Sequence, residues 1–277
     1  MSLMLKLLMS IAVATIAISA NTQPDNKLLL KYVKKNIVKN PQVEAKGVRV
    51  VESKTVEALP GWTVLFTTMD LVYQGKEIHA PETMFVKDGL VTGHLVDLKT
   101  GNDYRDEIKP TVPAGMYNDA HLLFGNKDAK HKILIFSDPL CPFCQEVVPE
   151  IFTIAQEYPE IMAVYYYHLP LLSLHPVSGI LTRIMHVAQE AGKRDIVAKM
   201  YSLQIDPREN NVTKVLEMVK KQTGYEVTEA QINQPKVKEA LESDEENAAR
   251  MMVTGTPTVY IDGEWDKTRD GYKKFIK

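Results

Sequence analysis

Apolar residues change their spacing along the chain, and the changes predict two folded modules. Over residues 27–40 they recur at helical spacing, which predicts one helix. Over residues 48–95 they fall in short runs separated by turn residues such as Asp88-Gly89, which indicates strands joined as hairpins. One helix followed by antiparallel strands predicts a small α+β module over residues 25–97.

The later part of the chain, residues 113–277, alternates between strand and helix patterns. An apolar run over residues 131–137 predicts a buried central strand, followed by a helix from residue 141 to 158 and a strand over 162–169. These three form a strand-helix-strand unit. Further helices and a last strand are then expected over residues 177–190, 194–203, 212–223, 237–252 and 256–261, with a short terminal helix over 272–277.

Charged residues gather between the modules and near the end of the helical section. Residues 98–112 are polar and punctuated by Gly101 and Pro110, which predicts a linker whose charges face solvent. The acidic run 242–246 is likewise expected to be a solvated helix face.

The first twenty residues have the pattern of a secretory signal. Lys6 precedes an apolar run that ends in Ser19-Ala20, which predicts a signal peptide over residues 1–20 with cleavage near Ala20. An uncleaved N-terminal anchor is the alternative. The chain is therefore expected to be exported to an oxidising compartment. Its 33 Lys and Arg against 35 Asp and Glu, a net charge of −2, do not favour nucleic-acid binding.

Both cysteines of the chain, Cys141 and Cys144, lie where the central strand gives way to a helix. Two thiols separated by two residues can form and break a disulfide reversibly. The helix N-terminus favours a thiolate at Cys141, the expected nucleophile. Cys144 lies one turn further on the same face, where it can attack a mixed disulfide at Cys141.

Two other interpretations of the cysteine pair remain open from the residues alone. A zinc site would need two histidines to complete it, and His168 and His175 are the nearest candidates. An inert structural disulfide would close so short a loop that it gains little chain entropy. Redox chemistry is favoured over both, with no metal and no cofactor besides the Cys141–Cys144 disulfide itself.

The segment Ile135-Phe136-Ser137-Asp138-Pro139-Leu140-Cys141-Pro142-Phe143-Cys144 resembles the active-site motif of the bacterial Dsb thioredoxin-fold proteins. The resemblance is closest to the DsbC and DsbG group of disulfide isomerases. It implies a cystatin-like α+β dimerisation domain at residues 25–97, a linker at 98–112 and a thioredoxin-fold α/β catalytic domain with a helical insertion at 113–277.

The resemblance also assigns roles to residues beyond the cysteines. Gly255-Thr256-Pro257 is similar to the family's cis-proline loop, which implies that Pro257 faces Cys141 and excludes metal from the thiols. It implies that the backbone of Thr256 binds an extended substrate by strand addition. Pro142 and Phe143 would tune the redox balance.

Two features bear on the direction of the redox reaction. Ile135 stands where thioredoxins and DsbA carry a buried acid, as in the isomerase group. The long helical section, with Leu174-His175-Pro176 at its start, looks DsbA-like instead. We therefore expect a periplasmic homodimeric isomerase or reductase acting on exported proteins with wrong disulfides. The alternatives are a dimeric DsbA-like oxidase and a chaperone for unfolded chains, and the membrane redox partner is either DsbD-like or DsbB-like.

Overall fold

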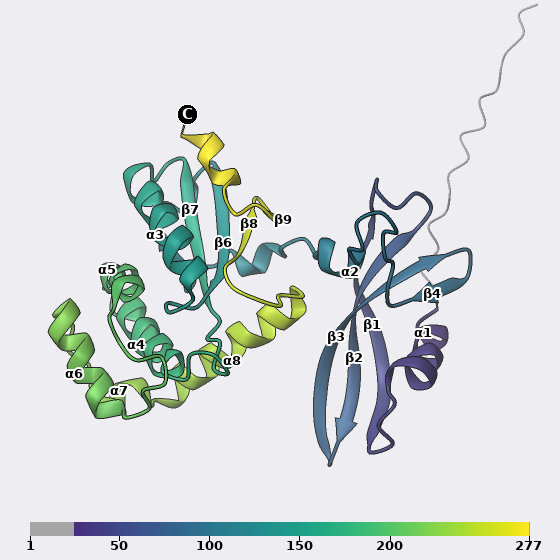
Figure 1. Ribbon diagram of the computed structural model, residues 1–277, viewed down its shortest axis with the longest axis horizontal. Helices are drawn as coiled ribbons and strands as arrows, with labels where there is room; N and C mark the ends of the chain where they lie inside the picture. The colour runs from purple at the N-terminus through teal and green to yellow at the C-terminus, as the bar shows by residue number, and fades with distance from the viewer. Residues whose placement is uncertain (1–24, 277) are drawn as a thin grey trace, which may run out of the picture.

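The computed structural model describes residues 25–276, which form two sheets, one in each half of the chain (Figure 1). The expected signal peptide, residues 1–20 with cleavage near Ala20, lies outside the described residues. Within residues 25–276, no helix is both long and apolar enough to cross a membrane.

The first half is an antiparallel sheet covered by one helix, the arrangement expected from the sequence. Its strands lie in chain order: β1 (Val43–Thr55), β2 (Thr63–Tyr73), β3 (Lys76–Lys87) and β4 (Leu90–Thr92). Helix α1 (Asn26–Tyr32) is capped by the side chain of Asp25 and continues as a π-helical turn (Val33–Ile37). Residues 63–73 form the single long strand β2.

Both faces of this sheet carry buried side chains, because residues 64–67 of β2 and 82–85 of β3 are all buried and successive side chains of a strand point to opposite faces. On one face, Leu65 and Met84 pack with Leu29 and Val33 of the helical segment. On the other, Phe66 packs in a second cluster that also takes in residues from the segment between the modules and Met252 from the second half. The second half of the chain therefore contributes to covering the first sheet.

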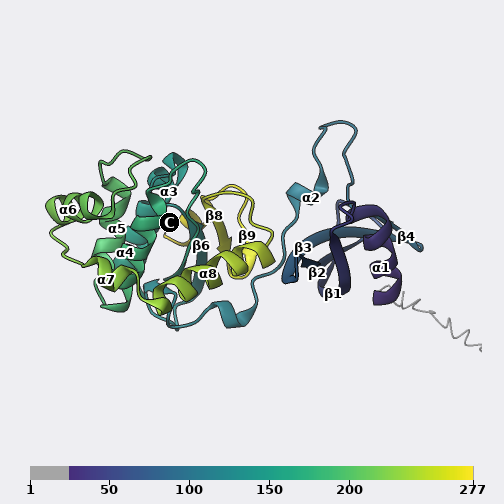
Figure 2. The ribbon, with the colours of Figure 1, turned by 90° about the horizontal axis from the view of Figure 1, so that it is seen from below.

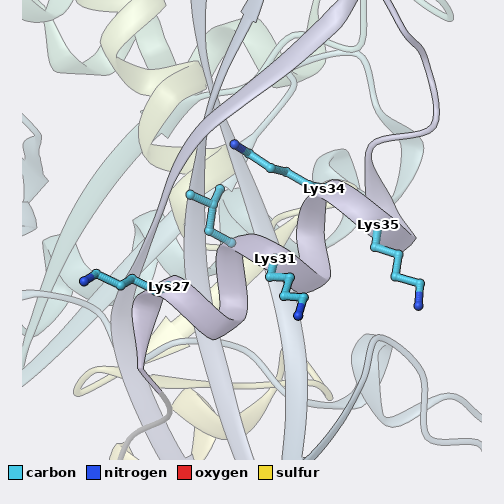
Figure 3. A pocket seen from close by; sticks show the side chains of 5 residues that line it. Lys27, Lys31, Lys34 and Lys35 are labelled. Atoms are coloured by element: carbon cyan, nitrogen blue, oxygen red, sulfur yellow. The ribbon is translucent and has the colours of Figure 1, made fainter.

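The outer face of α1 and of the turn that follows it is basic. Figure 3 shows four lysine side chains extending from this segment, and together with Leu30 they line a shallow hollow: Lys27, Lys31, Lys34 and Lys35. Figures 1 and 2 place α1 at the end of the molecule away from the second sheet. The basic face is thus remote from the cysteines.

The segment between the modules contains the short helix α2 (Tyr104–Glu107). Two charged side chains of this segment, Arg105 and Lys109, contact other parts of the protein. Arg105 pairs with Glu82 of β3 at 2.6 Å. The Nζ of Lys109, only 8% exposed, donates to the carbonyl of Met252 at 2.6 Å. The expectation of a solvated linker face is therefore wrong for these side chains, because they meet partners distant in sequence.

The second half is built on a mixed five-stranded sheet. Its spatial order is β5 (Leu122–Phe124), β7 (Met162–His168), β6 (His131–Ser137), β8 (Thr258–Ile261) and β9 (Glu264–Trp265). Strands β6 and β7 are parallel and joined through helix α3 (Pro142–Glu157), which confirms the expected strand-helix-strand unit. The other pairs are antiparallel.

Five helices follow β7 before the chain returns to the sheet: α4 (Ser178–Glu190), α5 (Arg194–Lys199), α6 (Val212–Thr223), α7 (Glu229–Ile232) and α8 (Pro235–Arg250). The bounds of α6 agree with the expected ones. Helix α7 was not expected, and the expected terminal helix is instead the 3-10 segment Gly271–Phe275, with residue 277 outside the described part. Strand β8 begins two residues after the expected residue 256, beyond Pro257.

The acidic run at residues 242–246 does not form a uniformly solvated face. Asp244 is 2% exposed and lies against β7. Its carboxylate accepts the backbone N–H of His168 at 2.9 Å and pairs with Nε2 of His121 at 2.8 Å. The expectation fails at this position because a buried carboxylate is stable where donors from other elements surround it.

Candidate active site

Strand β6 and helix α3 together position the two cysteines. Residues 133–137 of β6 are fully buried, and the chain then turns so that Cys141 becomes the N-cap of α3 and Pro142 its first residue. Proline suits this position because the first N–H groups of a helix have no partner within the helix. Cys141 is 5% exposed and Cys144 is fully buried, and no disulfide joins them in this structure.

The pKa values of the two cysteines are shifted in opposite directions. Hydrogen bonding from the side chain of Cys144 lowers the pKa of Cys141 to about 5, outweighing burial, with help from Thr256 and from the backbone N–H groups of Cys144 and Phe143. Burial raises the pKa of Cys144, and its hydrogen bond to Cys141 raises it further. Cys141 is therefore the thiolate at neutral pH, and Cys144 keeps its proton.

The loop at Pro257 lies directly against Cys141. The Thr256–Pro257 peptide bond is cis, as the resemblance implied. The Sγ of Cys141 lies 3.4 Å from the carbonyl oxygen of Thr256. The structure thus brings together Cys141, Cys144, Thr256 and Pro257, which sequence analysis had singled out separately.

Phe143 stands exposed beside the cysteines, with 60% of its surface open to solvent. The guanidinium of Arg269 lies 5.7 Å from the centre of its ring, a distance at which a cation and a ring attract. Phe143 borders two hollows. One, of about 360 Å³, is bordered by the Pro257 loop and by Asp106, Lys109, Trp265 and Lys267, and the other by residues of α3 and the C-terminal segment.

Asp138 is a buried acid that sequence analysis did not single out. It is fully buried three residues before Cys141, and its carboxylate accepts the backbone N–H groups of Leu140 at 2.8 Å and Leu171 at 2.7 Å. It also accepts the hydroxyl of Ser178 at 2.8 Å and meets Nδ1 of His175 at 3.2 Å. Asp138 therefore ties the cysteine loop to the segment that leads into α4.

The two histidines considered for zinc lie in different surroundings. His175 meets the carboxylate of Asp138, while His168 is 2% exposed and neither of its ring nitrogens has a hydrogen-bond partner. Burial lowers the pKa of His168 well below its ordinary value, so the ring is neutral. Within residues 25–276, no group of three or more His, Cys, Asp or Glu is arranged to hold a metal ion.

Several solved structures are similar to more than half of the chain. BdbD from Bacillus subtilis, in its oxidised form, is 16% identical over 60% of this chain and 92% of its own, with a TM-score of 0.47. A periplasmic thioredoxin-like protein from Salmonella enterica serovar Typhimurium is 20% identical over 60% and 95%, also at 0.47. The catalytic domain of Proteus mirabilis ScsC is 20% identical over 58% and 93%, at 0.44.

Among curated proteins, no sequence matches the chain. The model of one protein family, described as thioredoxin, matches residues 118–277. That range is more than half of the chain and contains the cysteine pair, the Thr256–Pro257 loop and every strand of the second sheet. The chain therefore belongs to the thioredoxin family and is a thiol-disulfide oxidoreductase.

Proposed function

We propose that the protein is a periplasmic disulfide isomerase or reductase of the DsbC and DsbG type, acting on cysteines of exported proteins. The observation that carries the chemistry is the division of acidity between the two sulfurs, a stabilised thiolate at Cys141 backed by a protonated thiol at Cys144. A thiolate is the form that attacks disulfides. Ile135, fully buried, supplies no proton acceptor for Cys144, which supports resolution by a second substrate thiol and hence the isomerase direction.

The reaction follows from this division of acidity. The thiolate of Cys141 attacks one sulfur of a substrate disulfide, forming a mixed disulfide and releasing the other substrate sulfur as a thiolate. In isomerisation, another substrate thiolate attacks the mixed disulfide and regenerates the thiolate of Cys141. In reduction, Cys144 attacks the sulfur of Cys141, so that the enzyme pair is oxidised and the substrate leaves with both thiols.

The surroundings of the pair suit an extended protein substrate. We assign strand-like binding of the substrate backbone to Thr256 and Pro257, whose loop lies against Cys141. Pro142 and Phe143 would tune the stability of the thiolate, Phe143 through a backbone N–H that lowers the pKa of Cys141. The exposed ring of Phe143 would meet apolar side chains beside the substrate cysteine.

The first module is proposed to be cystatin-like and to join two copies of the chain. An α-helix packed on a four-stranded antiparallel sheet supports this assignment. Strand β1 lies at one edge of the sheet, where it can pair with a second copy. Its register shifts next to Lys46 and Val51 limit such pairing to the parts of the strand between and beyond them.

A dimeric DsbA-like oxidase is the second candidate, and one observation favours it. Five helices, α4 to α8, separate β7 from β8, an insertion that looks DsbA-like. In that role the Cys141–Cys144 disulfide would be donated to substrates, and a DsbB-like membrane protein would restore it. The isomerase or reductase would instead be kept reduced by a DsbD-like partner.

The redox state of the cysteine pair in the periplasm separates the two roles. Thiols are trapped in acid, alkylated and counted by mass in cells that express the full chain. Mostly reduced Cys141 and Cys144 support isomerisation or reduction, whereas mostly oxidised cysteines make the protein a disulfide donor.

Reactivation of ribonuclease with scrambled disulfides tests the activity itself. The wild-type protein is expected to reactivate it and Cys141→Ala to lose all such activity. Retention of full activity by Cys141→Ala would leave only a chaperone role for the substrate-binding surface.

A further inference from the structure

Three buried hydroxyl groups form a hydrogen-bonded chain, and the last of them, Ser137, acts on Cys144. The hydroxyl of Tyr201 donates to the Oγ of Ser137 at 2.7 Å, and the hydroxyl oxygens of Tyr166 and Tyr201 lie 2.7 Å apart. Ser137 and Tyr166 are fully buried and Tyr201 is 4% exposed. The three residues come from the end of β6, from β7 and from the 3-10 segment after α5.

The direction of donation along this chain points toward the sulfur. Because Tyr201 donates to the Oγ of Ser137, the hydroxyl proton of Ser137 is not used in that contact, and the Ser137 side chain lowers the pKa of Cys144 against the opposing effect of burial. Burial raises the pKa of Tyr166 and of Tyr201, and the nearby Cys144 raises both further. Both tyrosines therefore remain protonated hydrogen-bond donors over the working pH range.

No carboxylate competes with the Ser137 hydroxyl for a role beside Cys144. Ile135 of β6 stands where thioredoxins and DsbA carry a buried acid, and the carboxylate of Asp138 already accepts from four donors. A hydrogen bond to an ion in a dry site is stronger than one between neutral groups. The Thr256 side chain and the backbone N–H of Asp138 also lower the pKa of Cys144.

We propose that Ser137 is a catalytic residue of the resolving step and that Tyr201 and Tyr166 are positioning residues for it. The inference rests on the proposed function, because it concerns the reduction half of that reaction. As Cys144 attacks, its proton passes to the departing substrate sulfur, and the Ser137 hydroxyl stabilises the negative charge that builds on Cys144. The mixed disulfide and the thiol become the Cys141–Cys144 disulfide and a free substrate thiol, so atoms and electrons balance.

The test follows two successive releases of a coloured thiol from dithiobis(nitrobenzoate) by the reduced full-length protein. The first release reports attack by Cys141 and the second reports attack by Cys144 on the mixed disulfide. Ser137→Ala and Tyr201→Phe are expected to slow the second release roughly tenfold or more, as loss of a hydrogen bond to a charged group does. The acid side of its pH profile should move to higher pH, while the first release is unchanged.

Matched variants separate this role from a structural one. Tyr166→Phe should have a smaller effect, since the Tyr166 hydroxyl contacts Tyr201 and the backbone carbonyl of Ser137 rather than the Ser137 hydroxyl. Ser137→Thr should restore the second release because it keeps the hydroxyl. The control is Tyr165→Phe, the same change in the neighbouring residue of β7, whose ring belongs to the core cluster on the other face of the sheet. It should leave both releases unchanged.

The outcomes distinguish this inference from the proposed function. Absence of the first release in the wild-type protein would overturn both, because Cys141 would not be a nucleophile. A normal first release together with an unchanged second release in Ser137→Ala and Tyr201→Phe would overturn only the role of the hydroxyl chain. Equal slowing of both releases would also overturn that role, because the hydroxyls would then support the site as a whole.

Discussion

The sulfur of Cys141 lies 3.4 Å from the carbonyl oxygen of Thr256, although the two residues are 115 positions apart in the chain. Strand β8, which follows Thr256, pairs antiparallel with β6, which precedes Cys141. The pairing of these two strands therefore holds the loop against the sulfur. A peptide bound along the loop would meet the reactive atom directly.

The nucleophilicity of Cys141 should persist into acid. Its alkylation by iodoacetamide is expected to show a midpoint near the pKa of about 5, because the thiolate is the reactive form. Cys144→Ala removes the hydrogen bond that contributes most to lowering this pKa, so the midpoint should rise. Alkylation rates measured by mass between pH 4 and pH 9 check both. A wild-type midpoint above roughly pH 8, the range of a free thiol, would contradict the assignment.

Asp138→Asn should destabilise the protein. An amide offers one acceptor oxygen, whereas the carboxylate accepts from four groups, so buried donors would lose their partner. We expect a loss of about 3 kcal/mol in the free energy of unfolding, measured by urea denaturation at pH 7. Asp119→Asn, the same change at an exposed position, is the control. Equal stability of the two variants would show that the Asp138 contacts contribute little.

Phe143→Ala should weaken substrate binding without affecting the fold. The ring is exposed beside Cys141, so its loss removes apolar contact area from the binding surface but little from the core. We expect KM for a protein disulfide to rise several-fold, with the free energy of unfolding within about 0.5 kcal/mol of the wild type. Leu90→Ala, which also truncates an exposed apolar side chain but in β4, serves as the control. An unchanged KM in Phe143→Ala would place substrate binding elsewhere.

Local signals in the sequence were sufficient for elements whose ends are set by neighbouring residues. Helix α6 spans the expected residues 212–223 because Asn211 caps its start and Gly224 adopts a left-handed conformation at its end, with φ of 76°. The apolar strand β6 followed by the cysteine motif likewise predicted the start of α3 to within one residue.

Features that depend on partners distant in sequence could not be predicted in this way. The sequence places Asp244 in an acidic run expected to be solvated, but α8 packs it against β7. Lys109 was expected to be a solvated linker residue, but its side chain donates to the carbonyl of Met252. In the sequence, Asp138 is one residue of the cysteine motif with no evident role. Its role in holding the cysteine loop depends on Leu171 and Ser178, which the fold brings within hydrogen-bond distance. Ser137 and Tyr201 show the same limit, since 64 positions separate the two hydroxyls.

The central claim is that Cys141 attacks the substrate and Cys144 resolves the mixed disulfide. The most direct measurement incubates the reduced full-length variants Cys144→Ser and Cys141→Ser with scrambled ribonuclease and determines intact masses without reductant. The account predicts a stable one-to-one mixed disulfide with Cys144→Ser, because the attacking sulfur remains and the resolving sulfur is gone, and none with Cys141→Ser, whose remaining thiol is buried and protonated. A mixed disulfide that accumulates on Cys141→Ser would contradict this account, and so would the absence of a mixed disulfide on Cys144→Ser.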